Sequence, residues 1–375
     1  MNWQNNKDMA NWFNIADIDA LDTPALVVYP GRVKQNIAAL VRAIDSADRL
    51  RPHVKTHKCK EATQLCLDAG IRKFKCATIA EAEMLALCKT PDVLLAYQPI
   101  GPKIKRLVAL IKQYRDTRFS CLIDNYEAAS AIDQIALAEQ ISLDVYIDLN
   151  VGMNRSGIAP QRAFVLYERC ELLQAIKVAG LHIYDGHIHD EDLSIRKQQC
   201  DAAFKPVEDL IAELHASGID PIVIAGGSPT FPIHAQRKNI ECSPGTFIYW
   251  DSGYAMALHE QQFLPAALVV ARVVSLPDDS KICVDLGHKS IASENVLDKR
   301  VTFLNAPQLK PVSHSEEHLV LEAGVNHNYK VGDVLYGVPH HICPTVALYE
   351  RAITIQNNQI SGDWRNIARD RKINV

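Results

Sequence analysis

Long apolar runs, signal-peptide patterns and paired cysteines are all missing from this sequence. No apolar run approaches the roughly 18–20 residues that a membrane-spanning helix needs, so we expect no membrane span. The first residues are polar and lack the basic-then-apolar pattern of a secretory signal. The ten cysteines are scattered singly without a CxxC pair, which is typical of free thiols in a reducing compartment. We therefore expect a cytoplasmic protein.

A large charge of one sign is lacking as well. The 40 Lys and Arg residues and 44 Asp and Glu residues give a formal net charge of −4, so nothing global predicts binding to nucleic acid or to an anionic membrane. Neither GxGxxG nor GxxxxGK[ST] follows an expected strand, which disfavours a nucleotide-binding open sheet. With 375 residues, 48% of them hydrophobic, the chain is long for one core, and two domains are expected.

Between residues 25 and 225 the chain alternates regularly between short apolar runs and helical patterns. The apolar runs are of the buried parallel-strand type, and the segments between them carry apolar residues on one helical face. We expect strands at 25–29, 51–55, 72–76, 92–96, 118–123, 143–149, 177–184 and 221–225, with helices at 58–69, 79–88, 102–114, 126–138, 160–175 and 192–217. Eight strands separated by helices predict a (β/α)8 TIM barrel, with a doubly wound open sheet as the alternative.

The rhythm changes after about residue 255. Short β-type runs at 267–274, 281–285 and 318–322 are separated by turn residues, and helical periodicity is nearly absent. We therefore expect a barrel over residues 23–255 and a C-terminal antiparallel β domain over 256–375, with residues 1–22 packing on the second domain.

One stretch of the expected barrel is unusually basic. Residues 51–58 read RPHVKTHK, and in an extended strand Arg51, His53, Lys55 and His57 would share one face. Crowded like charges and partial burial favour the neutral amine of a central lysine. A neutral lysine is what Schiff-base chemistry with a carbonyl or with pyridoxal phosphate (PLP) requires. The alternative is an edge strand whose basic face lies in water.

Polar and glycine-rich segments follow several of the expected strands, at the end of a barrel where active sites lie. Backbone N–H groups and hydroxyls can approach a phosphate closely at glycine-rich turns. An aromatic ring can stack on a flat heterocycle, and an arginine can hold a phenolate or carboxylate. The candidates are Gly226, Gly227, Ser228, Gly245 and Thr246 for the phosphate, Tyr184 for stacking and Arg155 for the oxygen. With Lys55 they predict a site for an aldehyde cofactor.

These segments resemble a known family. The residues that carry the resemblance are TPALV at 23–27, RPHVKTHK at 51–58, GMNRSG at 152–157, YDGH at 184–187, PGT at 244–246 and HIC at 341–343. They are similar to the D-threonine aldolase and D-serine dehydratase group of the alanine-racemase-like, fold-type III PLP enzymes. The resemblance extends from about Thr23 to the region of Trp364, and RPHVKTHK is highly specific.

The resemblance implies how PLP is held. It implies a barrel with PLP on Lys55, a C-terminal β domain, and a homodimer with active sites at the subunit interface. His53, on the same face of the expected strand as Lys55, is a further candidate for the cofactor site. Tyr184 falls where the family places the ring that faces the pyridine, and Arg155 falls where it places the arginine near the phenolic oxygen. Gly245 and Thr246 match part of the phosphate cup. Ser243 differs, because alanine racemases have an arginine there, and this weakens a racemase assignment.

The pair His341 and Cys343 is a candidate metal site. The two residues lie two apart on an expected strand, so their side chains would share a face, although an isolated HxC is more often structural. The resemblance implies a divalent metal at this position. Imidazole plus thiolate favours zinc, with manganese or magnesium as alternatives. The metal would hold the β-hydroxyl of a substrate as a Lewis acid.

The expected activity is therefore that of a PLP- and metal-dependent lyase on β-hydroxy D-amino acids. Removal of the hydroxyl proton, with His187 or a metal-bound hydroxide as the candidate base, leads to an aldolase. Removal of the Cα proton by Lys55 leads to a dehydratase. An amino acid racemase or epimerase and a non-enzymatic PLP carrier are the alternatives.

Overall fold

The computed structural model describes residues 12–375, and the chain divides into two compact units. The first, here called the β unit, contains residues 12–37, 56–61 and 246–369. The second, here called the barrel unit, contains residues 38–55, 62–245 and 370–375. The chain passes from the barrel unit to the β unit after residue 245, somewhat before the change of pattern near residue 255.

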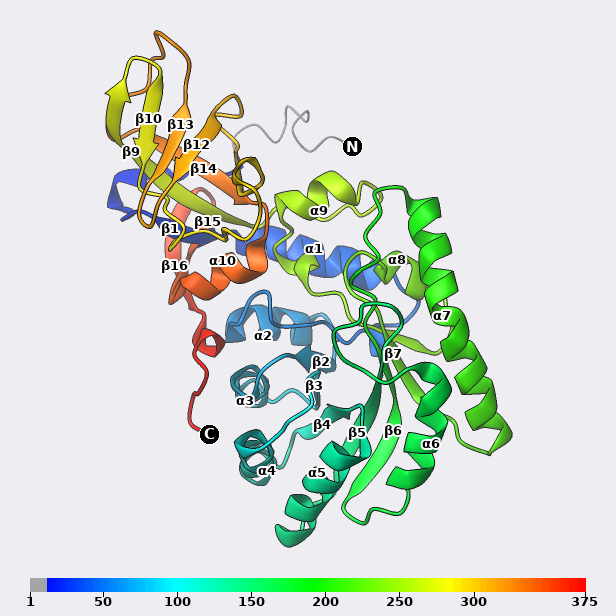
Figure 1. Cartoon of the computed structure of the whole chain (residues 1–375). Coiled ribbons are helices and arrows are strands. Elements are labelled where there is room, and N and C mark those ends of the chain that lie inside the picture. The colour runs from blue at the N-terminus through cyan, green and yellow to red at the C-terminus, as the bar shows by residue number, and fades with distance from the viewer. Residues whose placement is uncertain (1–11) are drawn as a thin grey trace. The chain divides into compact units, whose positions relative to one another are not determined.

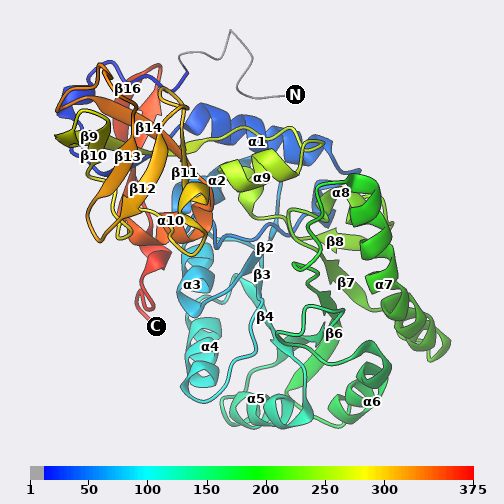
Figure 2. The ribbon, with the colours of Figure 1, turned by 45° about the horizontal axis from the view of Figure 1, so that its top comes forward.

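The barrel unit is built on a curled sheet of seven parallel strands that pair in chain order. The strands are β2 (Lys73–Cys76), β3 (Asp92–Leu95), β4 (Arg118–Ile123), β5 (Leu143–Leu149), β6 (Ile176–Ile183), β7 (Ile222–Ala225) and β8 (Ile240–Cys242). The helices between them are α3 (Ile79–Leu87), α4 (Pro102–Gln113), α5 (Tyr126–Ala138), α6 (Pro160–Cys170), α7 (Leu193–Ala216) and α8 (Phe231–His234). Helices α3 to α7 form an outer ring around the strands (Figure 2).

Local sequence signals set the starts of several of these helices. Thr78 accepts a hydrogen bond from the backbone N–H of Glu81, and the Glu81 carboxylate accepts one from the N–H of Ala77, which together cap α3. Asn125 caps α5 in the same way by accepting from the N–H of Ala128. Because such signals are local, the predicted helices agree with the observed ones to within a few residues, apart from the C-terminal end of α6.

A short irregular segment closes the barrel between β8 and β2. Leu50 forms a parallel bridge with Cys242 of β8, and His53 forms one with Lys75 of β2. The strand predicted over residues 51–55 is therefore reduced to single bridges, and residues 54–57 form a turn. The prediction of a (β/α) barrel is confirmed, although this segment is not the extended strand that was expected.

The first predicted barrel strand belongs to the other unit. Residues 25–28 form strand β1 (Ala25–Val28), but β1 pairs antiparallel with β9 (Ala267–Asp278) and parallel with β15 (Arg351–Gln356). The placement of this strand in the barrel was wrong, because an apolar run identifies a buried strand but does not identify its partners. The prediction also missed β8, which has only three residues and no apolar periodicity.

The β unit contains a nine-stranded sheet in which β9 is the long central strand (Figure 1). The main path runs in the order β12-β13-β10-β9-β1-β15-β16, and β14 joins β9 to β11 off this path. The remaining strands are β10 (Lys281–Val284), β11 (Val301–Phe303), β12 (Lys310–His314), β13 (Leu319–Glu322), β14 (Val334–Pro339) and β16 (Gln359–Arg365). Two short helices, α9 (Ser252–Ala257) and α10 (Ile342–Leu348), complete it, while α1 (Pro30–Arg42) and α2 (Lys60–Asp68) each contain residues of both units.

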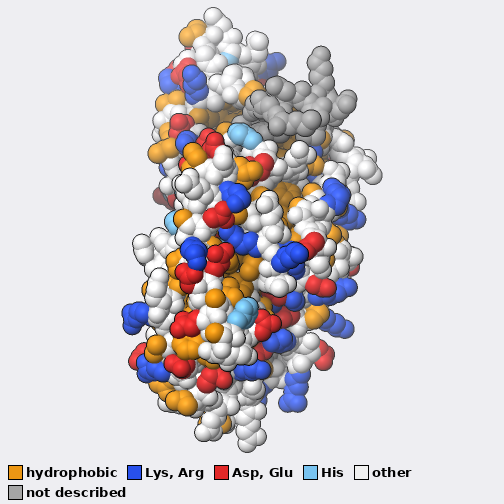
Figure 3. Space-filling model, turned by 90° about the vertical axis from the view of Figure 1, so that its right-hand side faces the viewer, with side chains coloured by type: hydrophobic (Ala, Val, Ile, Leu, Met, Phe, Trp, Pro, Cys, Tyr) orange, Lys and Arg blue, Asp and Glu red, His pale blue; other side chains and the backbone are white. Residues whose placement is uncertain are grey.

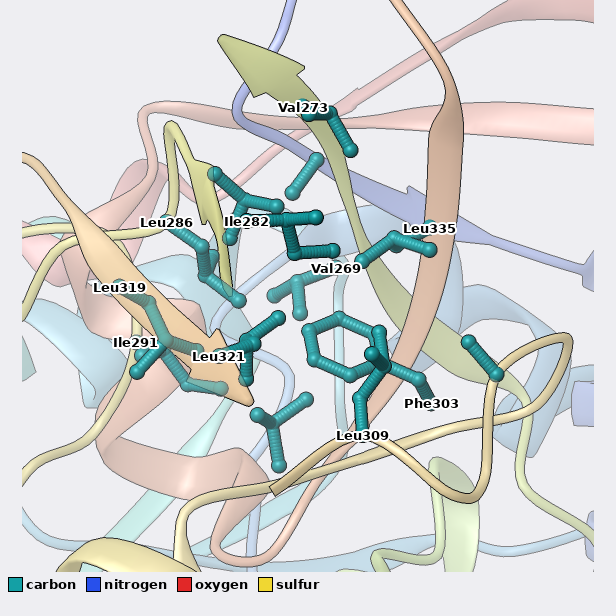
Figure 4. Packing of buried hydrophobic residues seen from close by; sticks show 14 residues of the cluster. Val269, Val273, Ile282, Leu286, Ile291, Phe303, Leu309, Leu319, Leu321 and Leu335 are labelled. Carbon is teal, nitrogen blue, oxygen red and sulfur yellow. The ribbon is translucent and has the colours of Figure 1, made fainter. Parts of the chain in front are cut away.

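Apolar side chains from several strands form the core of the β unit. Figure 4 shows the ring of Phe303 with Val269 on one side and Leu309 on the other, in a cluster that also includes side chains of β10 and β13. On the other side of the sheet, Phe13 and Leu21 pack in one cluster with Leu268 of β9. The N-terminal segment from residue 12 onward is therefore part of this core, whereas residues 1–11 lie outside the described part of the chain.

The surface carries no dominant charge on the face shown in Figure 3, where basic and acidic side chains are intermingled. Within residues 12–375, none of the helices combines the length and the apolar composition that would be needed to cross a membrane. The same residues include all ten cysteines, and no disulfide is formed among them.

Candidate active site

A cavity of about 520 Å³ opens in the barrel unit, at the C-terminal ends of β2 to β6. Four of the predicted site residues line it together: His53, Lys55, Arg155 and Tyr184. The other lining residues are Lys75, Ala77, Ala96, Tyr97, Gln98, Ile100, Leu122, Asp124, Asp148, Ser156 and His182. The structure therefore brings these four side chains together at one end of the barrel.

The ring of Tyr184 is the common neighbour of the cations in this cavity. The Lys55 Nζ atom lies 5.7 Å from the ring centroid, and the Cζ atom of Arg155 lies 4.9 Å from it. Two glycines lie close against the same ring. A Cβ atom at Gly186 would lie 2.4 Å from Tyr184 Cζ, and one at Gly227 would lie 3.1 Å from its Cε2. A side chain at either glycine would therefore press against the Tyr184 ring.

The glycine-rich segment after β7 contributes a tight turn. Gly226 has a φ of +80°, and the N–H of Gly227 donates a hydrogen bond to Thr230 Oγ1 at 3.3 Å. The N–H of Gly245 donates to Ser228 Oγ at 3.3 Å, which joins the two predicted phosphate-binding segments within the barrel unit. Thr246, the remaining member of the predicted set, is the first residue of the β unit after residue 245.

A buried polar cluster supports this turn. Asp185, the residue after Tyr184, accepts from Thr230 Oγ1 at 2.7 Å and lies 2.8 Å from Nε2 of His234. Cys200 Sγ lies 3.4 Å from the same histidine nitrogen. Asp185, Cys200 and His234 are thus three potential metal ligands close together, but Arg237 Nη1 lies 2.8 Å from Nδ1 of His234 and brings a positive charge to the cluster. We therefore assign to this cluster a structural role, which is to hold the turn at Gly226 and Gly227 in place.

The predicted basic face is not observed. Arg51 points to the opposite end of the barrel, where its buried guanidinium pairs with Glu241 at 2.7 Å and with Asp92 at 2.5 Å. His57 is a buried residue of the β unit, and burial lowers its pKa to about 3. Arg51 and His57 therefore do not share one strand face with Lys55, because residues 54–57 form a turn instead of continuing the strand.

Three buried polar residues of the cavity were missed as site residues. Lys75 is the last but one residue of β2, and burial together with the charge of Lys55 lowers its pKa to about 7. Asp148 and His182 are neighbours on β5 and β6, with His182 Nδ1 2.7 Å from Asp148 Oδ1. Burial and the nearby Lys75 lower the pKa of His182. The available signal was a charged or polar residue inside an otherwise apolar strand, which a buried strand does not tolerate without a reason.

His187, the predicted base, lies beside the turn after β5. It is exposed, and a Cβ atom at Gly152 would lie 2.8 Å from its Nε2. It is not among the described side chains that line the cavity around Lys55. Its proposed role as a base remains a prediction.

The predicted metal ligands lie at the start of a helix rather than on a strand. Strand β14 ends at Pro339, His341 precedes α10, and Cys343 lies in its first turn. The two side chains still interact: although burial opposes it, Cys343 and Glu294 raise the pKa of His341 to about 9. Glu294 Oε1 lies 2.5 Å from His341 Nδ1, which leaves Nε2 as the nitrogen for a ligand.

Further groups of the β unit surround this pair. Asp251 accepts from the backbone N–H of Ile342 at 3.1 Å and so fixes the turn between His341 and Cys343. Thr56 Oγ1 lies 3.1 Å from Cys343 Sγ, and Thr246 Oγ1 lies 3.9 Å from it. Two segments of the resemblance, around residues 56 and 246, therefore meet at the thiol of Cys343.

Comparison with known families identifies the larger part of the chain. Residues 28–253 match the family described as "Alanine racemase, N-terminal domain". The chain belongs to this family. Residues 266–355 match a second one, described as "Putative serine dehydratase domain". The two matches correspond to the barrel and β-domain parts expected from the sequence.

Several known proteins resemble the chain over most of its length. The D-threonine aldolase of Arthrobacter sp. is 27% identical over 359 residues, which cover 93% of each chain. The 3-hydroxy-D-aspartate aldolase of Paracoccus denitrificans (strain Pd 1222) is 24% identical over 94% of this chain and 93% of its own. The crystal structure of D-threonine aldolase from Filomicrobium marinum has a TM-score of 0.87 at 25% identity and covers 95% of this chain and 98% of its own.

The residues of the cavity fit PLP, which family membership supports as the cofactor. Lys55 provides an amine, Arg155 provides a fixed cation and Tyr184 provides an aromatic ring. Gly186 and Gly227 lie so close to this ring that a larger residue at either position would crowd it. Ser243 Oγ is buried without a hydrogen-bond partner among the described residues, as a group awaiting a ligand would be. An imidazole and a thiolate, as His341 and Cys343 offer, are ligands that a divalent transition metal accepts.

Proposed function

We propose that the chain is a PLP- and divalent-metal-dependent lyase that acts on β-hydroxy D-amino acids. The observation that carries the proposal is the convergence of Lys55, Arg155 and Tyr184 on one cavity in a chain whose relatives include D-threonine and 3-hydroxy-D-aspartate aldolases. When bound, PLP supplies an electron sink for negative charge at the substrate Cα, and the metal supplies a Lewis acid for the β-hydroxyl.

Different residues of the barrel unit would bind different parts of PLP. Lys55 would hold PLP covalently through its amine, and Tyr184 would face the pyridine ring. Arg155 would bind the phenolic oxygen, because a guanidinium offers fixed donors to an oxyanion. The phosphate would be bound by Gly226, Gly227, Ser228, Gly245 and Thr246. His53 would lie beside Lys55, whose backbone N–H donates a hydrogen bond to His53 Nδ1 at 3.2 Å.

His341 and Cys343 would hold the metal, with zinc as the proposed ion. Glu294 would orient the imidazole, as carboxylates do behind metal-binding histidines. Two protein ligands leave open positions, which a metal that contacts substrate requires.

The bond that breaks depends on which proton is removed first. If His187 removes the β-hydroxyl proton, the Cα–Cβ bond breaks and an aldehyde leaves. If Lys55 removes the Cα proton, hydroxide leaves to give an enamine, which water hydrolyses to a keto acid and ammonia. The aldolase relatives support the first route, and the second family match supports the second.

Product analysis with D-threonine tests the proposal. The purified protein is supplied with PLP and zinc, and glycine would identify an aldolase, 2-oxobutanoate a dehydratase, and L-allo-threonine, the product of inversion at Cα, a racemase or epimerase. Failure to consume D-threonine, D-serine and D-3-hydroxyaspartate would contradict the proposal. We further propose a cytoplasmic homodimer with active sites at the subunit interface, as the resemblance implies, and sedimentation analysis tests the assembly.

A PLP carrier without activity is less well supported. The chain carries a complete β unit with its own metal-ligand pair, which a simple carrier would not need. A cofactor absorbance band that no D-amino acid perturbs would favour the carrier.

A further inference from the structure

The cavity contains a second lysine whose situation is unusual. Lys75 is 3% exposed, and its Nζ atom has no hydrogen-bond partner among the described residues. A buried ammonium group without a partner is strongly unfavourable, so such a residue either loses its proton or serves a ligand. Its side chain nevertheless lines the cavity that Lys55 lines.

The two lysines share one aromatic neighbour. The Nζ atom of Lys75 lies 5.7 Å from the centroid of the Tyr184 ring, and so does that of Lys55. A lysine beside a second cationic group in a desolvated pocket is a known arrangement for activating an amine. Arg51 and His57 were expected as the cationic neighbours of Lys55, whereas in the structure Lys75 is the lysine that shares its cavity.

The charged and titratable groups around Lys75 come from several elements. Positive charge comes from Lys55 and Arg51, and negative charge comes from Asp148 on β5 and from Asp185 after β6. His182 of β6 also lines the cavity, and its pKa is lowered by burial and by Lys75. Arg155, His53 and Asp124 are further charged or titratable residues that line the cavity, together with the phenols of Tyr97 and Tyr184.

We propose that Lys75 is a second amine of the active site. It would be a positioning residue whose positive charge, when present, disfavours a positive charge on Lys55. The proposal deepens the proposed function, on which it depends for the role of Lys55. A proton on Lys75 repels a proton on Lys55, and the repulsion is mutual because the same pair of charges is involved. Burial and the charge of Lys55 bring the pKa of Lys75 to about 7, so its proton is exchanged near neutral pH.

The first test follows the absorbance of bound PLP as a function of pH. The wild type, with PLP loaded, should show a spectral transition near neutral pH. Lys75→Met removes the charge at similar length, Lys75→Arg makes it permanent, and both should lose the transition. Lys73→Met is the matched control, because Lys73 lies two residues earlier on β2 and pairs with Glu241; it should keep the transition. An unchanged transition in Lys75→Met would overturn the proposal.

The second test needs no cofactor and guards against variants that misfold. Wild-type protein without PLP is labelled by reductive methylation with formaldehyde at a series of pH values, and the labelling of Lys75 is mapped by mass spectrometry. Labelling of Lys75 should reach half of its maximum near neutral pH, and in Lys55→Met this midpoint should move to higher pH. A midpoint in the range of ordinary lysines, or one that Lys55→Met does not move, would overturn the proposal.

The two failures can be told apart. If Lys55→Met retained PLP as tightly as the wild type, the assignment of Lys55 would fail, whereas the labelling midpoint of Lys75 would still report its own proton. If PLP were lost but the labelling midpoint did not move, the proposed function would stand and the role of Lys75 would be wrong.

Discussion

The Nδ1 atom of His182 lies 2.7 Å from Oδ1 of Asp148 inside the barrel. Asp148 also accepts from Ser156 Oγ at 2.9 Å. Burial acts against the Asp148 carboxylate, but the His182 hydrogen bond and the neighbouring charges outweigh it and lower the pKa of Asp148. The carboxylate is therefore stabilised in the folded protein.

Asp148→Asn should lower the free energy of unfolding by about 1–3 kcal/mol at pH 7, because a charge-assisted hydrogen bond is lost. The folded pKa of Asp148 is depressed, so the difference from the wild type should be present above pH 4 or so and vanish as the pH falls through the folded pKa. Urea unfolding at several pH values measures this. Asp220→Asn, in an exposed pair with His215, is the control and should change stability by less than about 1 kcal/mol.

Lys55→Ala should abolish the visible absorbance of bound PLP after gel filtration, because no covalent attachment remains. Lys60→Ala, an exposed lysine at the start of α2, should keep the band. Full retention of absorbance in Lys55→Ala would refute the cofactor assignment.

His341→Ala and Cys343→Ala should each remove the bound metal, as measured by mass spectrometric metal analysis, and should remove lyase activity together with it. Glu294→Gln should weaken metal binding by about 10–100-fold, because it orients the His341 imidazole. His340→Ala provides the matched control and should retain the metal. Activity that survived both EDTA and His341→Ala would instead support a racemase.

Gly186→Ala should weaken PLP binding more than Gly227→Ala, since the added Cβ atom would approach the Tyr184 ring to 2.4 Å in the first case and 3.1 Å in the second. PLP titration followed by absorbance gives the order. Gly31→Ala in α1 is the control: nothing lies within 4 Å of its added Cβ, so PLP affinity should not change, and stability should rise by about 0.4–1 kcal/mol.

The burial of His57 should make the stability of the protein depend on pH. Its pKa is about 3 in the folded protein against an ordinary value of 6.5, so its contribution is complete above pH 6.5 and is lost as the pH falls toward 3. The free energy of unfolding should fall by about 1.4 kcal/mol per pH unit below pH 6 or so from this residue alone. His57→Gln should make the slope shallower. The exposed His189→Gln should leave it unchanged, and equal slopes for all three proteins would contradict the assignment.

Local patterns located most elements well. Helix α5 begins at an asparagine cap and β5 is an apolar run, and both were found with their observed bounds because their signals lie within the element. The pairing of β1 was not found, because its partners β9 and β15 lie more than 200 residues further along the chain and depend on long-range packing.

The sequence by itself determined which residues come to the C-terminal end of the barrel, since in a parallel (β/α) array every strand delivers its last residues to the same end. Arg155 and Tyr184 follow from that rule, because they come after β5 and β6. Lys55 was placed there by the same rule, although its segment forms single bridges and a turn instead of a strand. What only the tertiary structure decided is which side chains face one another there. Arg51 turns to Glu241 because a buried guanidinium requires carboxylates. Lys75 lies at the same Tyr184 ring as Lys55, because closure of the barrel brings the segment around His53 beside β2.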